Sequence, residues 1–226
     1  MQKLLIRGKK RLSGSISISG SKNATLPILA ATILSSKVTL KNVPFVKDVF
    51  TMIDLLSSIG LNVKINKKKN LLKIKNTNLS LNTIATYKLV KTMRAGVLVL
   101  GPLLAKCKKA KVSLPGGCAI GTRPVDLHLF ALKKLGAKIK IKNGYIYAST
   151  ENGLEGSKIN FPKVSVGATE NAIIASAYAK GKTTLFNCAI EPEVKDLIFF
   201  LRKLGCKISI NKRKIAVIGG FSPLNI

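Results

Sequence analysis

Three turns rich in small residues carry side chains that could do chemistry, and each precedes an expected helix. The first turn, over 19–24, reads Ser-Gly-Ser-Lys-Asn-Ala and leads into an apolar helix over Leu26–Leu34. Backbone N–H groups at a helix start attract an anion, and Lys22 adds a full positive charge there. The pattern indicates an anion-binding turn. The alternative is that Ser21 or Asn23 only caps the helix and Lys22 is solvated.

The second segment, Leu114–His128, contains proline and three glycines, so we expect a loop. Cys118 lies in this loop and Arg123 follows five residues later. A neighbouring cation increases the thiolate fraction of a cysteine, which can then act as an acid, a base or a nucleophile. The alternative is a small buried cysteine in a turn. We interpret Asp126 and His128, in the helix that follows, as cap or surface residues.

The third turn, over 163–169, reads Lys-Val-Ser-Val-Gly-Ala-Thr and is the counterpart of the first turn in a later repeat. It could bind a second anion, or it could be a turn that every repeat needs. Arg94 starts an apolar run that ends at Ala105. If the repeats share one geometry, the candidate thiol and the candidate cations converge at one rim of the domain; they are Cys118, Lys22, Arg94, Arg123 and Lys163.

The chain repeats itself, and the repeats are the elements that must position these residues. Three segments share one ending, in which the last turns of a helix are followed by glycine and an alternating strand; they are Leu55–Ile65, Ala131–Ile141 and Phe200–Ile210. Gly60, Gly136 and Gly205 stand where a helix C-cap needs a positive φ. These glycines therefore mark the ends of three equivalent helices.

Each ending is followed by an expected β-hairpin. The paired strands are Asn62–Asn66 with Leu71–Lys75, Lys138–Lys142 with Tyr145–Ser149, and Lys207–Asn211 with Lys214–Ile218. Apolar residues alternate with lysine, which is typical of sheets with one buried and one solvated face. We predict three β-α-β-α-β-β units in one α/β domain, with the apolar faces of the sheets packed around helices.

The composition describes a folded chain with a large excess of positive charge. Of 226 residues, 46% are apolar, and 39 Lys and Arg outnumber 9 acids, for a formal charge of +30. A disordered chain is excluded by this apolar content, and the charge favours anionic partners. A nucleic-acid-binding protein is one alternative. It requires basic residues on one face with interleaved aromatics, whereas aromatics are 5% and basic residues occur in all three hairpins.

The sequence shows neither a membrane-spanning run nor a signal peptide, which favours a cytoplasmic protein. The four cysteines have no metal-ligand spacing, so we expect neither a metal nor a cofactor. We interpret Cys107, Cys188 and Cys206 as packing residues.

Four motifs occur in an order and at spacings that resemble one enzyme family. They are GSKNATLPILAA from Gly20, VKTMRA from Val90, LPGGCAIGTRPVDLHL from Leu114 and KVSVGATENA from Lys163. Over essentially its whole length the chain resembles the UDP-N-acetylglucosamine enolpyruvyl transferases. The cysteine loop separates that family from its shikimate-pathway relative. The resemblance implies an inside-out α/β barrel fold, with two domains of three such units each.

The resemblance also implies a reaction. The enolpyruvyl group of phosphoenolpyruvate is transferred to the 3′-hydroxyl of UDP-N-acetylglucosamine, the first committed step of peptidoglycan synthesis. Cys118 would protonate the methylene carbon and would be the thiol that fosfomycin alkylates. Lys22, Asn23 and Arg123 would contact phosphoenolpyruvate. Contacts to the UDP-sugar would come from Arg94, Arg123, Pro124, Val125, Asp126, Leu127, Lys163, Val164, Ser165 and Val166.

In that family the active site lies between two domains, and this sequence matches only the first three units. We expect residues 1–20 to be strands that belong to the other domain, and residues 21–226 to form one domain with units over about 21–76, 77–150 and 151–220. A second chain could supply the missing part. Without it we expect weak UDP-sugar binding and no turnover, and we expect no membrane and no specific nucleic acid as partner. A fragment, a split-gene product, a decayed gene and a folded non-catalytic remnant are all open.

Overall fold

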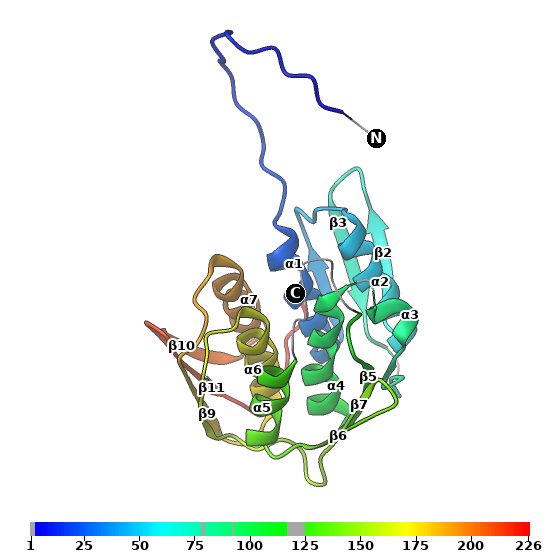
Figure 1. The fold of residues 1–226 in the computed structure, drawn as a ribbon, viewed down its shortest axis with the longest axis vertical. Helices are drawn as coiled ribbons and strands as arrows, with labels where there is room; N and C mark the ends of the chain where they lie inside the picture. The colour runs from blue at the N-terminus through cyan, green and yellow to red at the C-terminus, as the bar shows by residue number, and fades with distance from the viewer. Residues whose placement is uncertain (1–2, 78–79, 92, 117–124) are drawn as a thin grey trace.

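The protein is described by a computed structural model that covers residues 3–77, 80–91, 93–116 and 125–226. Figure 1 shows its helices and strands in chain order. The first unit contains α1 (Lys22–Ala31), the 3-10 helix η1 (Thr32–Leu34), β1 (Lys37–Leu40), α2 (Lys47–Ile59), β2 (Asn62–Asn66) and β3 (Leu71–Lys75). The second contains β4 (Ile84–Ala85), α3 (Tyr87–Val90), the 3-10 helix η2 (Arg94–Val99), α4 (Leu100–Cys107), β5 (Lys109–Ser113), α5 (Asp126–Lys134), β6 (Lys138–Lys142) and β7 (Tyr145–Ser149). The third contains β8 (Lys158–Asn160), α6 (Val166–Tyr178), β9 (Lys182–Phe186), α7 (Pro192–Lys203), β10 (Lys207–Asn211) and β11 (Lys214–Ile218).

Each unit builds one sheet, and the sheet orders are β1-β3-β2, β4-β5-β7-β6 and β10-β11-β9-β8. The hairpin strands have the bounds that the alternation of apolar residues and lysine predicts. The second and third sheets also hold a short parallel edge strand, β4 beside β5 and β8 beside β9. The described part of the first unit has no strand ahead of α1, so that unit follows the predicted β-α-β-α-β-β order without its first strand.

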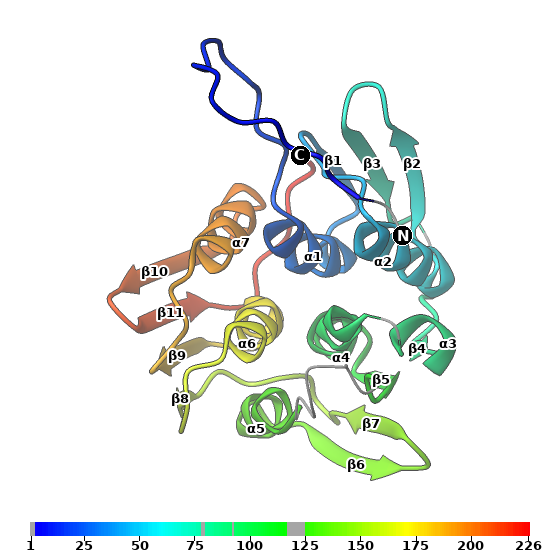
Figure 2. The same ribbon diagram turned by 45° about the horizontal axis from the view of Figure 1, so that its top comes forward.

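The three sheets form outer walls around a layer of helices, as Figure 2 shows. Among these helices, α1 packs against α2 and α7, while α6 packs against α4 and α5. In the strands Ile74, Ile146 and Val217 are buried against the helices. Lysines on the opposite faces of the same hairpins are exposed, as at Lys73, Lys140 and Lys214. The predicted α/β fold with inward apolar sheet faces is therefore confirmed.

Glycine ends the helix that precedes each hairpin. Gly60, Gly136 and Gly205 have φ angles of 115°, 93° and 103°. A side chain at such angles is strained, so glycine is required to turn the chain from helix into strand. This is the prediction made from the repeated endings, and it is confirmed.

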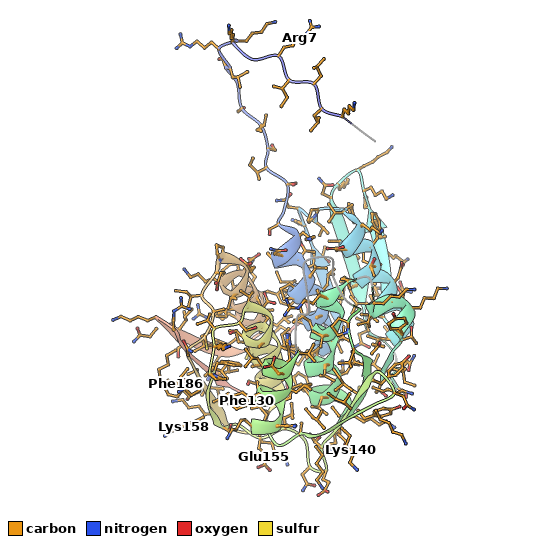
Figure 3. The ribbon with its side chains drawn as sticks, in the orientation of Figure 1. Arg7, Phe130, Lys140, Glu155, Lys158 and Phe186 are labelled. Atoms are coloured by element: carbon orange, nitrogen blue, oxygen red, sulfur yellow. The ribbon has the colours of Figure 1, made fainter. Side chains whose placement is uncertain are left out.

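Residues 3–20 contain neither helix nor strand and extend away from the body of the molecule (Figure 1), with Arg7 far from the sheets (Figure 3). Their apolar side chains are almost fully exposed, as at Leu4 (94%) and Leu12 (93%). A strand needs a neighbour to satisfy its backbone, and the segment pairs with no strand among the described residues. That these residues belong to another domain stays a prediction.

The last residues of the chain lie beside the first sheet. The Ile226 N–H donates to Lys37 O (3.3 Å), and the Thr39 N–H donates to Ile226 O (2.7 Å). Ile226 thus bonds to Lys37 and to Thr39, the two residues that flank position 38, and this is the hydrogen-bond pattern of parallel strands. Ile226 therefore occupies, beside β1, the position that β4 and β8 occupy in the other two sheets.

Candidate functional site

A hollow of about 620 Å³ opens where several helices begin. Residues of the first turns of α1, α2, α5, α6 and α7 line it, together with the start of η2. Helix N-termini carry unpaired N–H groups and a partial positive charge. Several of them around one space make an environment that favours anions such as phosphate. This convergence follows from the repeat, because equivalent helices start at the same end of each unit.

Lys22 stands at the mouth of the hollow, and its Nζ donates to Asp48 Oδ2 at 2.9 Å. Both side chains are partly exposed, so this ion pair contributes little to stability and an incoming anion can separate it at low cost. Ser21 caps α1 by accepting from the Ala24 N–H, and Ser165 caps α6 by accepting from the Ala168 N–H. The anion-binding and the capping interpretations of the first turn are thus compatible.

His128 lines the hollow and is 3% exposed, so the interpretation of this residue as a cap or surface group is wrong. Asn171 holds the ring in place. The Asn171 Oδ1 accepts from the Gly101 N–H (2.9 Å), while its Nδ2 donates to Val97 O (3.3 Å) and lies 3.1 Å from His128 Nδ1. Because Nδ2 is a donor, Nδ1 is the acceptor and the imidazole proton sits on Nε2.

The imidazole of His128 stays neutral at physiological pH. Its burial, with a smaller contribution from the charge of Arg94, lowers the pKa to about 4. Nε2 lies on the side of Gly167 in the first turn of α6, where an added Cβ would be 3.3 Å from it. His128 therefore offers the hollow a neutral hydrogen-bond donor. Its burial depends on contacts with α6 that the local sequence pattern does not reveal.

Glu170 is a buried acid at the same hollow, and sequence reasoning missed it. It is 4% exposed, and its Oε1 has no hydrogen-bond partner among the described residues. Burial, together with the charges of Glu193 and Glu191, raises the pKa of its carboxyl to about 8. The group is therefore mostly protonated at neutral pH and can donate as well as accept a hydrogen bond.

The structure brings part of the predicted site together. The hollow is lined by five of the predicted residues, Lys22, Asn23, Arg94, Ser165 and Val166. Others lie beside it: Val125 is buried in the core, Asp126 and Leu127 start α5, and Lys163 and Val164 are exposed ahead of α6. Cys118, Arg123 and Pro124 lie outside the described residues, so their expected convergence with Lys22 stays a prediction.

The cysteines interpreted as packing residues are buried or half-buried. Burial raises the pKa of the Cys188 thiol to about 12 and that of Cys206 to about 11. Cys107 is half-buried at the end of α4, and burial raises its pKa as well. These thiols are protonated at neutral pH and are poor nucleophiles.

Across the described ranges, no helix combines the length and apolarity needed to cross a bilayer. In the same ranges no three His, Cys, Asp or Glu side chains are grouped as metal ligands.

Similar proteins carry names that agree with this chemistry. Three relatives are named UDP-N-acetylglucosamine 1-carboxyvinyltransferase. The one from Pelagibacter ubique is 62% identical over 225 residues, covering 99% of this chain and 53% of that protein. The one from Rickettsia prowazekii is 54% identical, covering 92% of this chain and 50% of that protein. The one from Coxiella burnetii (strain Dugway 5J108-111) is 48% identical, covering 100% of this chain and 52% of that protein. The chain thus spans about half the length of these relatives.

Solved structures show the same fold. The enolpyruvyl transferase NikO from Streptomyces tendae matches with a TM-score of 0.78 at 18% identity, over 96% of this chain and 51% of that one. EPSP synthase from Acinetobacter baumannii matches with a TM-score of 0.76 at 18% identity, over 94% of this chain and 48% of that one. A family model described as EPSP synthase (3-phosphoshikimate 1-carboxyvinyltransferase) matches residues 6–225. The resemblance drawn from the four motifs is confirmed, and the chain belongs to this family of enolpyruvyl transferases.

Proposed function

We propose that this chain is the part of a UDP-N-acetylglucosamine 1-carboxyvinyltransferase that carries most substrate-binding residues. The observation that supports this most directly is the hollow in which several helix N-termini meet Lys22 and Arg94. Both substrates, phosphoenolpyruvate and the UDP-sugar, are polyanions, and such a site suits phosphate and diphosphate groups. The names of relatives at 48–62% identity include UDP-N-acetylglucosamine and the transfer of a carboxyvinyl group. The proposal places the reaction in the cytoplasm.

The proposed reaction is an addition followed by an elimination. A base takes the proton of the acceptor's 3′-hydroxyl, and the 3′-oxygen bonds to C2 of phosphoenolpyruvate while C3 gains a proton from an acid. The C2–O bond to phosphate then breaks, C3 loses a proton, and the enol ether and inorganic phosphate are the products. Lys22 and Asn23 at the start of α1 hold the donor phosphate, and a positive charge there stabilises the leaving group. In this proposal Cys118 supplies the proton to C3 and Arg123 binds the same phosphate.

His128 fits this scheme as a neutral donor. Its Nε2–H can hydrogen-bond a phosphate or sugar oxygen without changing the charge of the site, because its pKa is about 4. Arg94, at the start of η2 and lining the same hollow, provides the fixed charge. The residues that contact the acceptor hydroxyl belong, in this proposal, to the half of the relatives that the chain does not span.

Calorimetric titration of the chain with UDP-N-acetylglucosamine tests the binding role of the hollow. We expect weak binding, and Arg94→Gln should reduce the affinity about tenfold or more, because a charge-assisted contact to the UDP-sugar is lost. Lys73→Gln removes the same charge from the exposed face of β3 and should change the affinity less than about twofold. Absence of binding heat, or equal losses in the two variants, would contradict the proposal.

Phosphate release tests the division of the active site. The chain alone should release no phosphate from phosphoenolpyruvate and UDP-N-acetylglucosamine. Release should appear when a chain corresponding to the second half of the Pelagibacter ubique relative is added, and it should require both substrates. Turnover by this chain alone, with both substrates required, would show that the missing half is dispensable.

A further inference from the structure

The solvent face of the second sheet combines lysine and tyrosine in a regular array. We call it the lysine–tyrosine face and define it by seven residues of β5, β6 and β7: Lys109, Lys111, Lys138, Lys140, Lys142, Tyr145 and Tyr147. The opposite face of the same strands is apolar and packs on the helices. Figure 3 shows Lys140 at the periphery of the molecule.

Strand register places Tyr147 between two lysines, and Tyr145 between Ser113 and Lys142. Tyr147, on the central strand β7, has Lys111 of β5 on one side and Lys140 of β6 on the other. In the neighbouring row Ser149 stands between Lys109 and Lys138. Along β5 and β6 the lysines repeat at every second residue, which is about 6.7 Å. The face thus has an aromatic centre and a row of cations on each side.

One side of Tyr147 is occupied and the other opens into a hollow. The Lys111 ammonium lies 4.7 Å from the Tyr145 ring centroid and 5.2 Å from that of Tyr147, so it sits near both rings. A hollow of about 540 Å³ is lined by Tyr147, Ser149, the exposed Ile84 and the surrounding lysines, and Tyr145 does not line it. The hollow therefore lies toward Ser149, and among its lining residues Tyr147 is the one with an aromatic ring.

The other two sheets, built from the same unit, lack this combination. The equivalent hollow of the first sheet is lined by Lys37, Lys64, Lys73, Lys75 and Asn62, with no aromatic ring. On the third sheet, among the described residues, one strand lysine lies over an aromatic ring. It is Lys214, which lies over Phe186, and both residues are at strand ends. A general excess of lysine explains cations on all three sheets but does not explain two tyrosines on the central strand of one.

Negative charge is nearly absent from this face. None of the described strands contains Asp or Glu. The carboxylate closest to the array in the chain is that of Glu151, which pairs with Lys138. Both side chains are 73% exposed, so that pair separates easily. The remaining lysines of the face are available to an external anion.

We propose that the lysine–tyrosine face binds single-stranded nucleic acid, with a base stacked on Tyr147 and the phosphates along the lysines of β5 and β6. Base stacking on an aromatic ring beside a cationic track is how sequence-tolerant proteins bind single strands. A base-free polyanion would use the lysines but gain nothing from a ring set between them. This site is distinct from the hollow at the helix N-termini and does not depend on the function proposed for it.

Fluorescence anisotropy of a labelled oligothymidylate of about 12 nucleotides tests the proposal. At about 0.1 M salt, where exposed charges are partly screened, Tyr147→Ser should weaken binding by about tenfold or more, although the net charge is unchanged. Phe199→Ser is the matched control, because Phe199 is an exposed ring on α7 with Lys203 4.9 Å from its centroid. That control should bind like the unmodified chain.

A second comparison separates this face from the general positive charge. Replacing Lys111 and Lys140 by Gln should weaken binding more than replacing Lys73 and Lys75, although both pairs of substitutions remove two charges from an exposed sheet face. Inorganic polyphosphate should bind the unmodified chain and Tyr147→Ser equally. Equal affinity of Tyr147→Ser and the unmodified chain for the oligonucleotide, or equal effects of the two lysine pairs, would overturn the proposal.

Discussion

Replacing Glu170 by Gln should raise the free energy of unfolding at pH 9 by about 4 kcal/mol and leave it nearly unchanged at pH 4.5. The carboxyl has a folded pKa of about 8 against an ordinary value of 4.5. A raised pKa means that the folded state holds the proton more tightly, so the stability is fully present below pH 4.5. It is lost progressively as the pH rises from 4.5 through 8, because the unfolded state releases the proton over that range while burial beside Glu191 and Glu193 keeps it on the folded state.

The single histidine modifies this profile at its acidic end. The folded pKa of His128 is about 4, below its ordinary 6.5, so the unfolded state binds the extra proton between those values. Stability from this residue is complete above pH 6.5 and is lost as the pH falls toward 4. Between pH 4.5 and 6.5 the two slopes cancel, and above 6.5 only the Glu170 loss remains.

Urea unfolding at pH 4.5, 6.5 and 9 measures the effect. Glu155→Gln makes the same chemical change at an exposed position and should shift the stability by less than about 0.5 kcal/mol at each pH. If the Gln variant at position 170 loses stability from pH 6.5 to 9 as steeply as the unmodified chain, Glu170 is not the group that titrates.

Asn171→Leu should reduce the free energy of unfolding by about 4 kcal/mol. The change leaves the Gly101 N–H, Val97 O and the His128 ring without their shared partner, and each buried unpaired group costs about 1–3 kcal/mol. Asn171 also packs closely on Gly101, because a Cβ added to Gly101 would lie only 2.1 Å from the Asn171 Oδ1. Chemical denaturation at pH 7 gives the loss directly.

Asn171→Asp is the informative companion variant. It keeps an oxygen to accept from the Gly101 N–H but places a carboxylate beside His128, which should raise the pKa of the imidazole. The chain has one histidine, so its ring signals in a proton NMR titration are unambiguous. A pKa that stays near 4 in the Asp variant would mean that Asn171 does not contact the ring in solution.

Sequence patterns within a few residues predicted the hairpins and the helix ends. The edge strands and the buried residues of the site depend on contacts between distant parts of the chain. The strand bounds around Asn143-Gly144 follow from alternation and turn chemistry, which act over a few residues. The edge strand β4 has two residues and exists because β5 lies beside it, so no local pattern reveals it. For the site, the repeat placed Lys22 and Ser165 together, whereas the burial of His128 and Glu170 arises from packing between units.

The parallel pairing of Ile226 with β1 has a consequence for how the domain comes apart. It joins the last unit to the first, so the three units form a closed ring rather than an open array. An open array of repeats can fray from a terminal repeat, because each repeat contacts only its neighbours. A ring offers no terminal repeat, so its three sheets should melt together in a single cooperative transition.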